Sequence, residues 1–332
     1  MNLIEDTAFS NFSALKLTDK ASFYLELNSI EQIKTINRIA HEKKLPVLFL
    51  GEGTNIVPSK DYEGLVVKNK LLGISQKDEY IIEVASGENW HNFVQWSLLN
   101  LKFGLENLAL IPGTVGAAPV QNIGAYGSEI SDYIKEVSVF NLKNNSFEVM
   151  DSKACEFGYR RSIFQKRSDL IILSVTFELN KEPRINCSYE SLKKEIDNKG
   201  VKVDDLTPMD VFQLVSDIRK RVLPNHRELP NVGSFFKNTE LSKEEFNKVN
   251  LSPKVPVFKK GDTYKISSAF LIEEAGWKGY QKDAIGISDL HSLVLITYKE
   301  TSGQELINFA NAIIKDIFHK TGIKLEIEPT VL

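Results

Sequence analysis

One stretch of the chain, residues 104–130, combines many small residues with almost no charge. It carries five glycines, among them Gly113, Gly116, Gly124 and Gly127, and the two adjacent alanines Ala117 and Ala118. A linker that is merely flexible would be more polar. Small residues in an apolar loop instead allow the main chain to pack against a flat ring, or to bring its amides to a phosphate. We therefore favour a loop that contacts a cofactor over a loop without a ligand.

A second glycine-rich stretch, residues 48–57, follows a short apolar run. A predicted strand ends at Gly51, and Gly53, Thr54 and Asn55 follow it. Two glycines after a strand allow backbone N–H groups to approach a phosphate. A Rossmann fingerprint would need a third glycine and a helix directly after the turn, and a P-loop would need Gly-Lys-Ser/Thr, so neither is expected. Taken alone, such a turn is more often an ordinary strand–turn than a ligand site.

Composition and charge are those of an ordinary globular chain. Its 332 residues suffice for about two or three domains, and a formal net charge of −3 does not favour nucleic acid or an anionic membrane. No apolar run is long enough to span a bilayer, and the N-terminus lacks a signal pattern. The two cysteines suit a reducing cytoplasm, and the five histidines lie too far apart to suggest a metal site. We therefore expect a cytoplasmic protein without metal, nucleic acid or membrane partners. A monomer is expected as well, although the sequence does not reveal the oligomeric state.

Apolar periodicity predicts mixed α/β structure over residues 1–180. A helix is expected over 29–44, with Ser29 as its N-cap and Gln32 completing a capping box. Alternation on both sides of Asn144-Asn145 predicts a hairpin. A further helix is expected over 89–101, and strands over 45–50, 63–69, 80–87 and 169–180.

The pattern changes after residue 182, where a predicted strand gives way to a polar, proline-containing stretch. Helices with one apolar face are expected over 207–223, which starts with Thr-Pro, and over 301–322, which ends at a glycine. A strand over 323–332 is expected to close the chain. We place the domain boundary here, which gives domains 12–182 and 183–332.

The segment 231–239, NVGSFFKNT, places one serine among aromatic residues. Ser234 follows Gly233 and precedes Phe235 and Phe236. A loop that happens to carry a serine is the ordinary interpretation, and from this segment alone it is preferred. The alternative is a proton donor in a pocket from which the aromatic rings exclude water.

Four segments in this order carry a resemblance to a known family: LGEGTNIV, the loop 104–130, FGYRRSIFQ at 157–165, and NVGSFFKN. Together they resemble the UDP-N-acetylenolpyruvoylglucosamine reductase family, the flavoenzymes that make UDP-N-acetylmuramate for the bacterial cell wall. The similarity covers almost the whole chain. It implies an α+β (mixed α/β) fold, with a FAD-binding domain of the vanillyl-alcohol-oxidase (PCMH) type followed by a C-terminal substrate-binding domain.

The resemblance also implies that non-covalent FAD is wrapped by both glycine-rich stretches. In the family, backbone amides meet the pyrophosphate and small residues admit the isoalloxazine ring. The positions that match are Gly51, Gly53, Thr54, Asn55, Pro112, Gly113, Thr114, Gly116, Ala117, Gln121, Asn122, Gly124, Ala125 and Tyr126.

The implied reaction has two halves: NADPH reduces FAD and leaves, and flavin N5 then delivers hydride to the enolpyruvyl group. By resemblance, Arg160 pairs with the substrate carboxylate and the developing enolate, which suits a fixed guanidinium fork. Ser234 protonates the carbanion, for which it must be close and already oriented. Glu328 completes the stabilisation of the enolate. The family pattern selects Arg160 over the adjacent Arg161, and favours Glu328 over Glu326, its rival on the same predicted strand face.

Contacts to the sugar nucleotide are implied for Tyr189, Lys237 and Asn238, and Tyr189 marks the subtype with an extra tyrosine loop. A packed tyrosine and a solvated lysine are strong alternatives for these residues. The chain departs from the family at Val222, where a lysine often contacts the nucleotide. Arg221 or Arg227 could supply that charge instead.

Two rival functions remain at this stage. A flavin oxidase of the same fold often holds FAD covalently through a histidine, but no histidine lies in 48–60 or 110–130. A sugar-nucleotide-binding protein that has lost its chemistry is disfavoured because all three matched catalytic residues are present.

Overall fold

A computed structural model describes residues 2–332 of the chain. These form two compact units, and the chain passes between them several times. The first unit holds the N-terminal residues through Glu5, Phe23–Glu52 and Glu63–Arg219, and the second holds Asp6–Ser22, Gly53–Tyr62 and Lys220–Leu332. The predicted domains 12–182 and 183–332 differ from these units, because residues 183–219 belong with the first unit and two short N-terminal segments belong with the second. As domain limits they stay a prediction.

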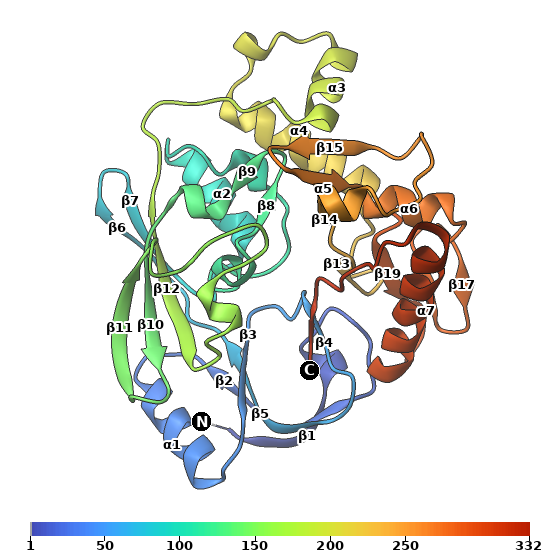
Figure 1. The fold of residues 1–332 in the computed structure, drawn as a ribbon. Coiled ribbons are helices and arrows are strands. Elements are labelled where there is room, and N and C mark those ends of the chain that lie inside the picture. Colours follow the sequence, from blue (N-terminus) through green and yellow to red (C-terminus); the bar gives the residue numbers. More distant parts are fainter. Residues whose placement is uncertain (1) are drawn as a thin grey trace. The chain divides into compact units, whose positions relative to one another are not determined.

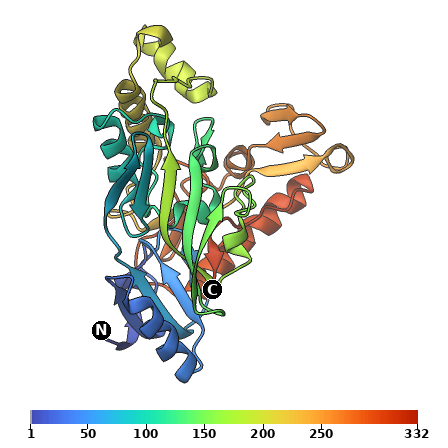
Figure 2. The same ribbon diagram turned by 90° about the vertical axis from the view of Figure 1, so that its left-hand side faces the viewer.

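A four-stranded sheet and one helix form the end of the first unit nearest the N-terminus. The sheet has the order β1 (Ile4–Ala8), β2 (Lys20–Leu27), β5 (Tyr62–Asn69), β3 (Val47–Leu50), and β3 runs parallel to β5. Helix α1 (Gln32–Glu42) covers this sheet in both views (Figures 1 and 2). Ile33 and Ile36 of α1 share a buried cluster with Leu25, Leu65 and Val67 of the strands. The amphipathic face of the helix therefore closes the sheet from one side.

A five-stranded antiparallel sheet makes up the rest of this unit. Its order is β11 (Ser146–Asp151), β10 (Ile134–Asn141), β12 (Leu170–Glu178), β7 (Ile81–Ala85), β6 (Ile74–Asp78). The central strand β12 is buried at every residue except its last, which fits a sequence that is apolar apart from Ser174, Thr176 and the terminal Glu178. The predicted hairpin is confirmed, with Phe140 opposite Phe147. Helix α2 (Trp90–Leu99) is capped by Asn89, whose side chain accepts a hydrogen bond from the Asn92 N–H.

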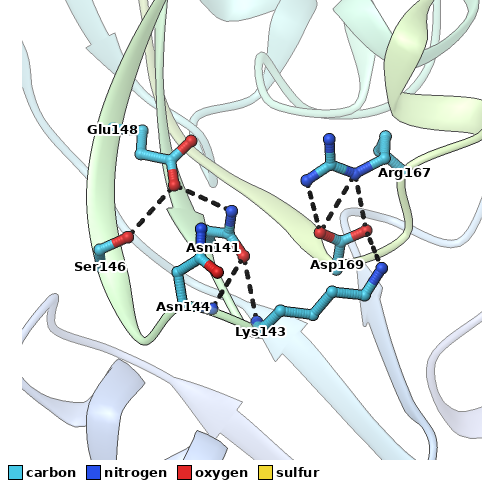
Figure 3. A network of polar contacts seen from close by, with 7 residues as sticks. All are labelled: Asn141, Lys143, Asn144, Ser146, Glu148, Arg167 and Asp169. Carbon is cyan, nitrogen blue, oxygen red and sulfur yellow. Dashed lines mark hydrogen bonds and ion pairs between the residues drawn. The ribbon is translucent and has the colours of Figure 1, made fainter.

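Polar side chains fix the tip of the β10–β11 hairpin (Figure 3). Asn141 Oδ1 accepts from the backbone N–H groups of Lys143 (3.0 Å) and Asn144 (3.2 Å). Nearby, Asp169 pairs with Arg167 at 2.7 Å and with Lys143 at 3.3 Å. Hydrogen bonds from these cations lower the pKa of Asp169 to about 2. The turn is thus held by an ion pair as well as by its backbone.

Two helices follow the sheet: α3 (Glu190–Lys199) and α4 (Pro208–Val222). The predicted Thr-Pro start of α4 is confirmed, since Pro208 is its first residue. Buried residues along α4 recur at helical spacing, among them Val211, Val215 and Ile218. This face is apolar core, as its periodicity predicts.

The second unit has a sheet of order β13 (Asn231–Ser234), β19 (Val294–Thr297), β18 (Ile285–Ile287), β17 (Gln281–Lys282), all antiparallel. Helix α7 (Gly303–Thr321, red in Figure 1) buries its apolar stripe in one core with Ile287 and Leu295 of that sheet. The remaining elements are α5 (Lys243–Phe246), α6 (Ser268–Glu274), the sheet β14 (Thr239–Ser242), β16 (Thr263–Ile266), β15 (Val257–Lys260), and the parallel pair β4 (Ile56–Val57) and β20 (Thr330–Val331).

Two sequence predictions about elements are corrected. Helix α1 begins at Gln32, not Ser29, and Ser29 does not cap it; Gln32 Oε1 still accepts from the Ser29 N–H at 3.3 Å, so half of the expected capping box is formed. The predicted strand over 323–332 is also largely wrong: regular pairing is limited to one bridge at Ile327 and to β20. Its apolar alternation reflects Ile323 and Leu325 packing into the core of the second unit. Within residues 2–332, no helix combines the length and apolar character needed to cross a bilayer.

Candidate functional site

The glycine turn after β3 packs its first half against the glycine-rich loop of the first unit. A Cβ at Gly51 would lie 2.3 Å from Thr114 Oγ1, so only glycine permits this approach. Glu52 joins the same two stretches, since its carboxylate accepts from the Gly113 N–H (3.2 Å) and from Asn89 Nδ2 (2.8 Å). The structure therefore brings Gly51 and Glu52 of the first glycine-rich stretch against Gly113 and Thr114 of the second.

The second half of the turn, Gly53 to Asn55, belongs to the second unit. Gly53 has a φ of 69°, and a Cβ there would lie 2.4 Å from the carbonyl oxygen of Phe12. The Asn55 carbonyl accepts from the Thr330 N–H at 3.0 Å. Thr54 and Asn55 are half-buried, and no helix follows them, as the sequence predicts.

The loop itself turns sharply several times. Six of its residues have a positive φ, namely Gly104 (123°), Leu110 (57°), Gly113 (120°), Asn122 (44°), Tyr126 (47°) and Gly127 (81°). Not every small residue faces outward, because a Cβ at Gly116 would lie 2.4 Å from Ser86 Cβ. Packing within the protein therefore explains that glycine.

The loop combines buried, half-buried and exposed positions. Ala117 is exposed, and Pro112, Gly124, Ala125 and Tyr126 are half-buried. The other predicted cofactor-binding positions of the loop are buried, namely Gly113, Thr114, Gly116, Gln121 and Asn122. Among the proposed cofactor-binding positions, those at the surface are thus small residues, a proline and a tyrosine; Leu110, Ile111, Val120, Ile123 and Glu129 of the loop are half-buried as well.

Asn122 ties the loop to the turn that carries Arg160. Its side chain is fully buried; Nδ2 donates to Glu129 Oε2 (2.9 Å) and to the Gly158 carbonyl (3.1 Å), while Oδ1 accepts from the Ser131 N–H (3.1 Å). Both of its amide hydrogens and its oxygen are therefore used. An asparagine also tolerates the left-handed backbone found here better than most residues do.

Arg160 lies directly against this loop. Its Nη2 donates to the Gly124 carbonyl at 2.7 Å, and a Cβ at Gly124 would lie 3.1 Å from its Nη1. The φ of Arg160 is 49°, a costly conformation for a residue with a long side chain. Arg160 is half-buried whereas Arg161 is exposed. The backbone turn thus directs Arg160, and not its neighbour, to the loop.

Arg219 is a second guanidinium at this place, and the sequence predictions did not include it. Its Nε donates to the Leu110 carbonyl at 3.2 Å. Burial lowers the pKa of Arg219, the Arg160 charge lowers it further, and Tyr126 opposes the shift. Two positive charges that act on each other favour an anion beside them. Helical spacing could have found Arg219, because it lies one turn after the buried Val215 on α4.

Tyr189 adds an aromatic ring to the loop. It precedes α3 at its N-cap position, and its ring contacts that of Tyr126 edge-on, with 5.6 Å between centroids. Tyr189 is 50% exposed, so it is not a packed core tyrosine. Arg221 and Arg227, which were considered as substitutes for a lysine at Val222, are both exposed.

In the second unit, Ser234 is the last residue of β13 and is half-buried. Phe235 and Phe236 after it are fully buried, with ring centroids 5.5 Å apart. Close packing does not require Gly233, because a Cβ there would meet nothing within 4 Å. A φ of 71° explains the glycine instead.

The end of the chain runs beside this segment. The Glu328 N–H donates to the Phe235 carbonyl at 2.9 Å, and Phe236 forms an antiparallel bridge with Ile327. Ser234 and Glu328 therefore lie on adjoining backbone segments. Glu326, the rival of Glu328, is exposed and pairs with Lys237 at 3.4 Å, whereas Glu328 is half-buried.

The two other predicted substrate contacts of this unit have structural partners. Asn238 Oδ1 accepts from the Ser268 N–H (3.1 Å) at the start of α6, and the Lys237 carbonyl accepts from Ser268 Oγ (2.7 Å). Among residues 2–332, no three His, Cys, Asp or Glu side chains are grouped as metal ligands would be.

Comparison with known protein families gives two matches. A FAD binding domain model matches residues 21–145, which contain the glycine turn and the loop. A model of the UDP-N-acetylenolpyruvoylglucosamine reductase C-terminal domain matches residues 224–332, which contain Ser234 and Glu328.

Similar whole proteins point the same way. The chain is 36% identical to UDP-N-acetylenolpyruvoylglucosamine reductase of Burkholderia multivorans over 340 residues, which cover 100% of this chain and 97% of that protein. It is 35% identical to the enzyme of the same name from Flavobacterium johnsoniae, with 100% of both chains covered. The crystal structure of the reductase from Thermus caldophilus superposes with a TM-score of 0.69, at 21% identity and with 100% and 99% coverage, which shows a common fold.

Proposed function

The chain belongs to the UDP-N-acetylenolpyruvoylglucosamine reductase family, and on that premise we propose that it reduces UDP-N-acetylenolpyruvoylglucosamine to UDP-N-acetylmuramate, with FAD as cofactor and NADPH as reductant. The observation that carries the proposal is the contact of Arg160 with the loop, where its guanidinium donates to the Gly124 carbonyl at 2.7 Å. This loop lies in the part of the chain that matches a FAD binding domain, so a fixed cation stands beside the cofactor segment. A cytoplasmic location and a monomeric state stay predictions.

The residues of the two glycine-rich stretches fit FAD. When bound, FAD takes a hydride from the reductant and passes it to the substrate. No charged side chain occurs from Asn107 to Ser128, which suits a flat, uncharged ring. Close packing against Thr114 and Phe12 accounts for the glycines at 51 and 53, and the proposed contact of this turn with the FAD pyrophosphate rests on the family resemblance.

Arg160 is proposed to bind the carboxylate of the enolpyruvyl group. One of its five N–H donors holds the Gly124 carbonyl, and this bond fixes the orientation of the planar fork. A carboxylate gains most from a guanidinium that is already oriented, because negative charge spreads into it as the neighbouring carbon is attacked. Arg219 is a further positive charge near Arg160 and supports an anionic group at this place.

Ser234 is proposed to deliver the proton that completes the reduction. A serine hydroxyl is a weak acid, so it can serve only if it is held close to a strongly basic carbon. Its position at the end of β13, followed by two fully buried aromatic residues, supports a fixed donor. Glu328, on the adjoining segment, is proposed to stabilise the enolate together with Arg160, and its partial burial supports it over the exposed Glu326.

Tyr189 is the most strongly supported of the proposed nucleotide contacts. Half of its surface is exposed while its ring is held against Tyr126. Lys237 and Asn238 remain proposed contacts, although an ion pair with Glu326 and the start of α6 already engage them.

Anaerobic assays with the purified flavoprotein test the function. We expect continuous NADPH oxidation only when UDP-N-acetylenolpyruvoylglucosamine is present. Consumption of a single flavin equivalent of NADPH, with no further reaction after that substrate is added, would show that the substrate is wrong. Steady NADPH oxidation driven by oxygen alone would favour an oxidase, and protein that binds the sugar nucleotide without flavin would favour a non-catalytic binder.

A further inference from the structure

The segment from Asn186 to Tyr189 is fastened to the loop at Tyr126 and Gly127. Asn186 Nδ2 donates to the Gly127 carbonyl at 3.1 Å. Gly127 has a φ of 81°, a left-handed conformation that favours glycine, and a Cβ there would lie at an ordinary contact distance of 3.4 Å from Asn186 Nδ2. Asn186 Oδ1 in turn accepts from Ser188, from its N–H at 3.2 Å and its Oγ at 2.7 Å. One side chain therefore shapes the segment and attaches it to the loop.

Asn107, a buried residue of the loop, also joins the 186–189 segment to the loop at Tyr126. It is 1% exposed, and its Nδ2 donates both to the Tyr126 carbonyl (2.9 Å) and to the Asn186 carbonyl (2.8 Å). An amide group has two N–H donors, so both are spent on joining these two segments. Asn107 lies 79 residues from Asn186 in the sequence, and no local structure requires the bond.

The attachment also determines where the side chains of Cys187 and Tyr189 lie. Cys187 is buried, and burial together with the nearby Glu106 charge raises the pKa of its thiol, so it serves as an apolar anchor. Tyr189 then places its ring edge-on against Tyr126 at 5.6 Å. The segment is thus fixed by Asn107, Asn186 and Cys187, and the exposed aromatic group that it presents is Tyr189.

We propose that Asn107 and Asn186 form a clamp, the asparagine clamp, that positions Tyr189 beside the cofactor loop for binding the sugar-nucleotide substrate. The proposal rests on the function proposed above, in which Tyr189 contacts that substrate. Neither asparagine touches the substrate in this account; both are positioning residues that act through Tyr189. A clamp that joins the cofactor loop to a substrate-binding ring fixes where the substrate lies relative to FAD.

Steady-state kinetics of the flavin-loaded enzyme with Asn186→Ala test this inference. The variant keeps the Asn186 carbonyl and its bond from Asn107, but loses the bonds to Gly127 and Ser188. We expect the KM for UDP-N-acetylenolpyruvoylglucosamine to rise about fivefold to tenfold, the effect of losing one or two net hydrogen bonds. The value of kcat and the flavin content are expected to stay unchanged, since no reacting group is altered. Asn186→Asp, which keeps the acceptor for Ser188, should restore part of the KM.

Two comparisons separate positioning from a general loss of structure. Asn100→Ala removes an exposed amide that donates to one backbone carbonyl, of Trp96 at 2.8 Å, and should leave KM unchanged. In the double variant Asn186→Ala/Tyr189→Ala, the KM should equal that of Tyr189→Ala alone, because the clamp acts through the ring. Independent, multiplying effects would overturn the clamp, and so would an unchanged KM in Asn186→Ala. Wild-type enzyme that fails to turn over the substrate would instead overturn the proposed function, and the substrate role of the clamp with it.

Discussion

The two parts of the proposed catalytic machinery are held in place by different kinds of interaction. In the first unit, Arg160 and its loop are fixed by buried polar side chains, above all Asn122, which forms three hydrogen bonds. In the second unit, Ser234 is followed by fully buried phenylalanines and is bordered by backbone bonds to the end of the chain. Hydrogen bonds between polar side chains fix the orientation of a group, but each bond is lost when either partner is removed. Apolar packing fixes orientation less strictly, but it is sensitive to any loss of side-chain volume. The comparison predicts which substitutions harm chemistry and which harm stability.

The largest expected effect is on chemistry, from Ser234→Ala. The variant should fold and bind FAD, because Ser234 is half-buried and contributes little packing. We expect kcat to fall about 10²- to 10⁴-fold, the usual contribution of a positioned proton donor. Reduction of the flavin by NADPH should proceed at the wild-type rate in stopped-flow absorbance. Ser234→Cys keeps a donor and should recover part of kcat; full activity of Ser234→Ala would remove Ser234 from the mechanism.

The apolar side of the comparison predicts a large stability effect from Phe236→Ala. Removing this fully buried ring should lower the free energy of unfolding by about 3–5 kcal/mol. Phe258, which is 55% exposed, provides the matched control, and Phe258→Ala should change stability by less than about 0.5 kcal/mol. The midpoints of urea unfolding of the two variants, compared with that of the wild type, measure this difference in stability. Equal midpoints would mean that the aromatic pair after Ser234 is not what holds that segment.

The polar side predicts a smaller loss of stability, accompanied by a loss of cofactor. Asn122→Ala leaves the Ser131 N–H and the Gly158 carbonyl without their buried partner. We expect destabilisation of about 1–3 kcal/mol, together with weaker FAD retention, measured as the flavin-to-protein absorbance ratio after dialysis. Asn225→Ala removes an exposed amide that bonds to Glu228 and to the Arg227 N–H, and it should change neither quantity because these bonds are exposed. Full flavin content in Asn122→Ala would show that the loop keeps its shape without this tie.

The same comparison explains what the sequence could predict. Short sequence motifs were sufficient to predict the hairpin and most helices and to locate the glycine-rich stretches, because turn chemistry and periodicity act over a few residues. The predicted start of α1 at Ser29 was wrong, since the backbone there turns before the helix begins at Gln32. The closing strand was largely wrong because apolar alternation cannot distinguish a paired strand from an extended segment packed on a core.

The polar contacts of the first unit were beyond sequence reasoning for a different reason. Asn107 and Asn186 meet across 79 positions, and nothing in either neighbourhood marks them as partners. Arg219 carries a signal in its helical spacing, but its relation to Arg160 requires the fold. Apolar burial can be inferred from a pattern, whereas a specific polar pair requires knowledge of which two segments adjoin.

The smallest expected effect is the pH dependence conferred by Asp169 at the hairpin of the first unit. Its pKa is about 2 in the folded protein, because Arg167 and Lys143 hydrogen-bond the carboxylate, and about 3.9 in the unfolded chain. The ion pair therefore stabilises the fold above pH 4 and loses this contribution as the pH falls towards 2. Asp169→Asn should cost about 1 kcal/mol at pH 7, since two of the three side chains are largely exposed, and nothing near pH 2. Urea midpoints of both proteins between pH 7 and 2 measure this, with Phe236→Ala as the apolar reference, whose deficit should not depend on pH. The loss of stability in Asp169→Asn could instead stay constant down to pH 2. That outcome would mean that the hydrogen bonds of Asp169, and not its charge, hold the hairpin. It would weaken the contrast between polar and apolar support on which all four predictions rest.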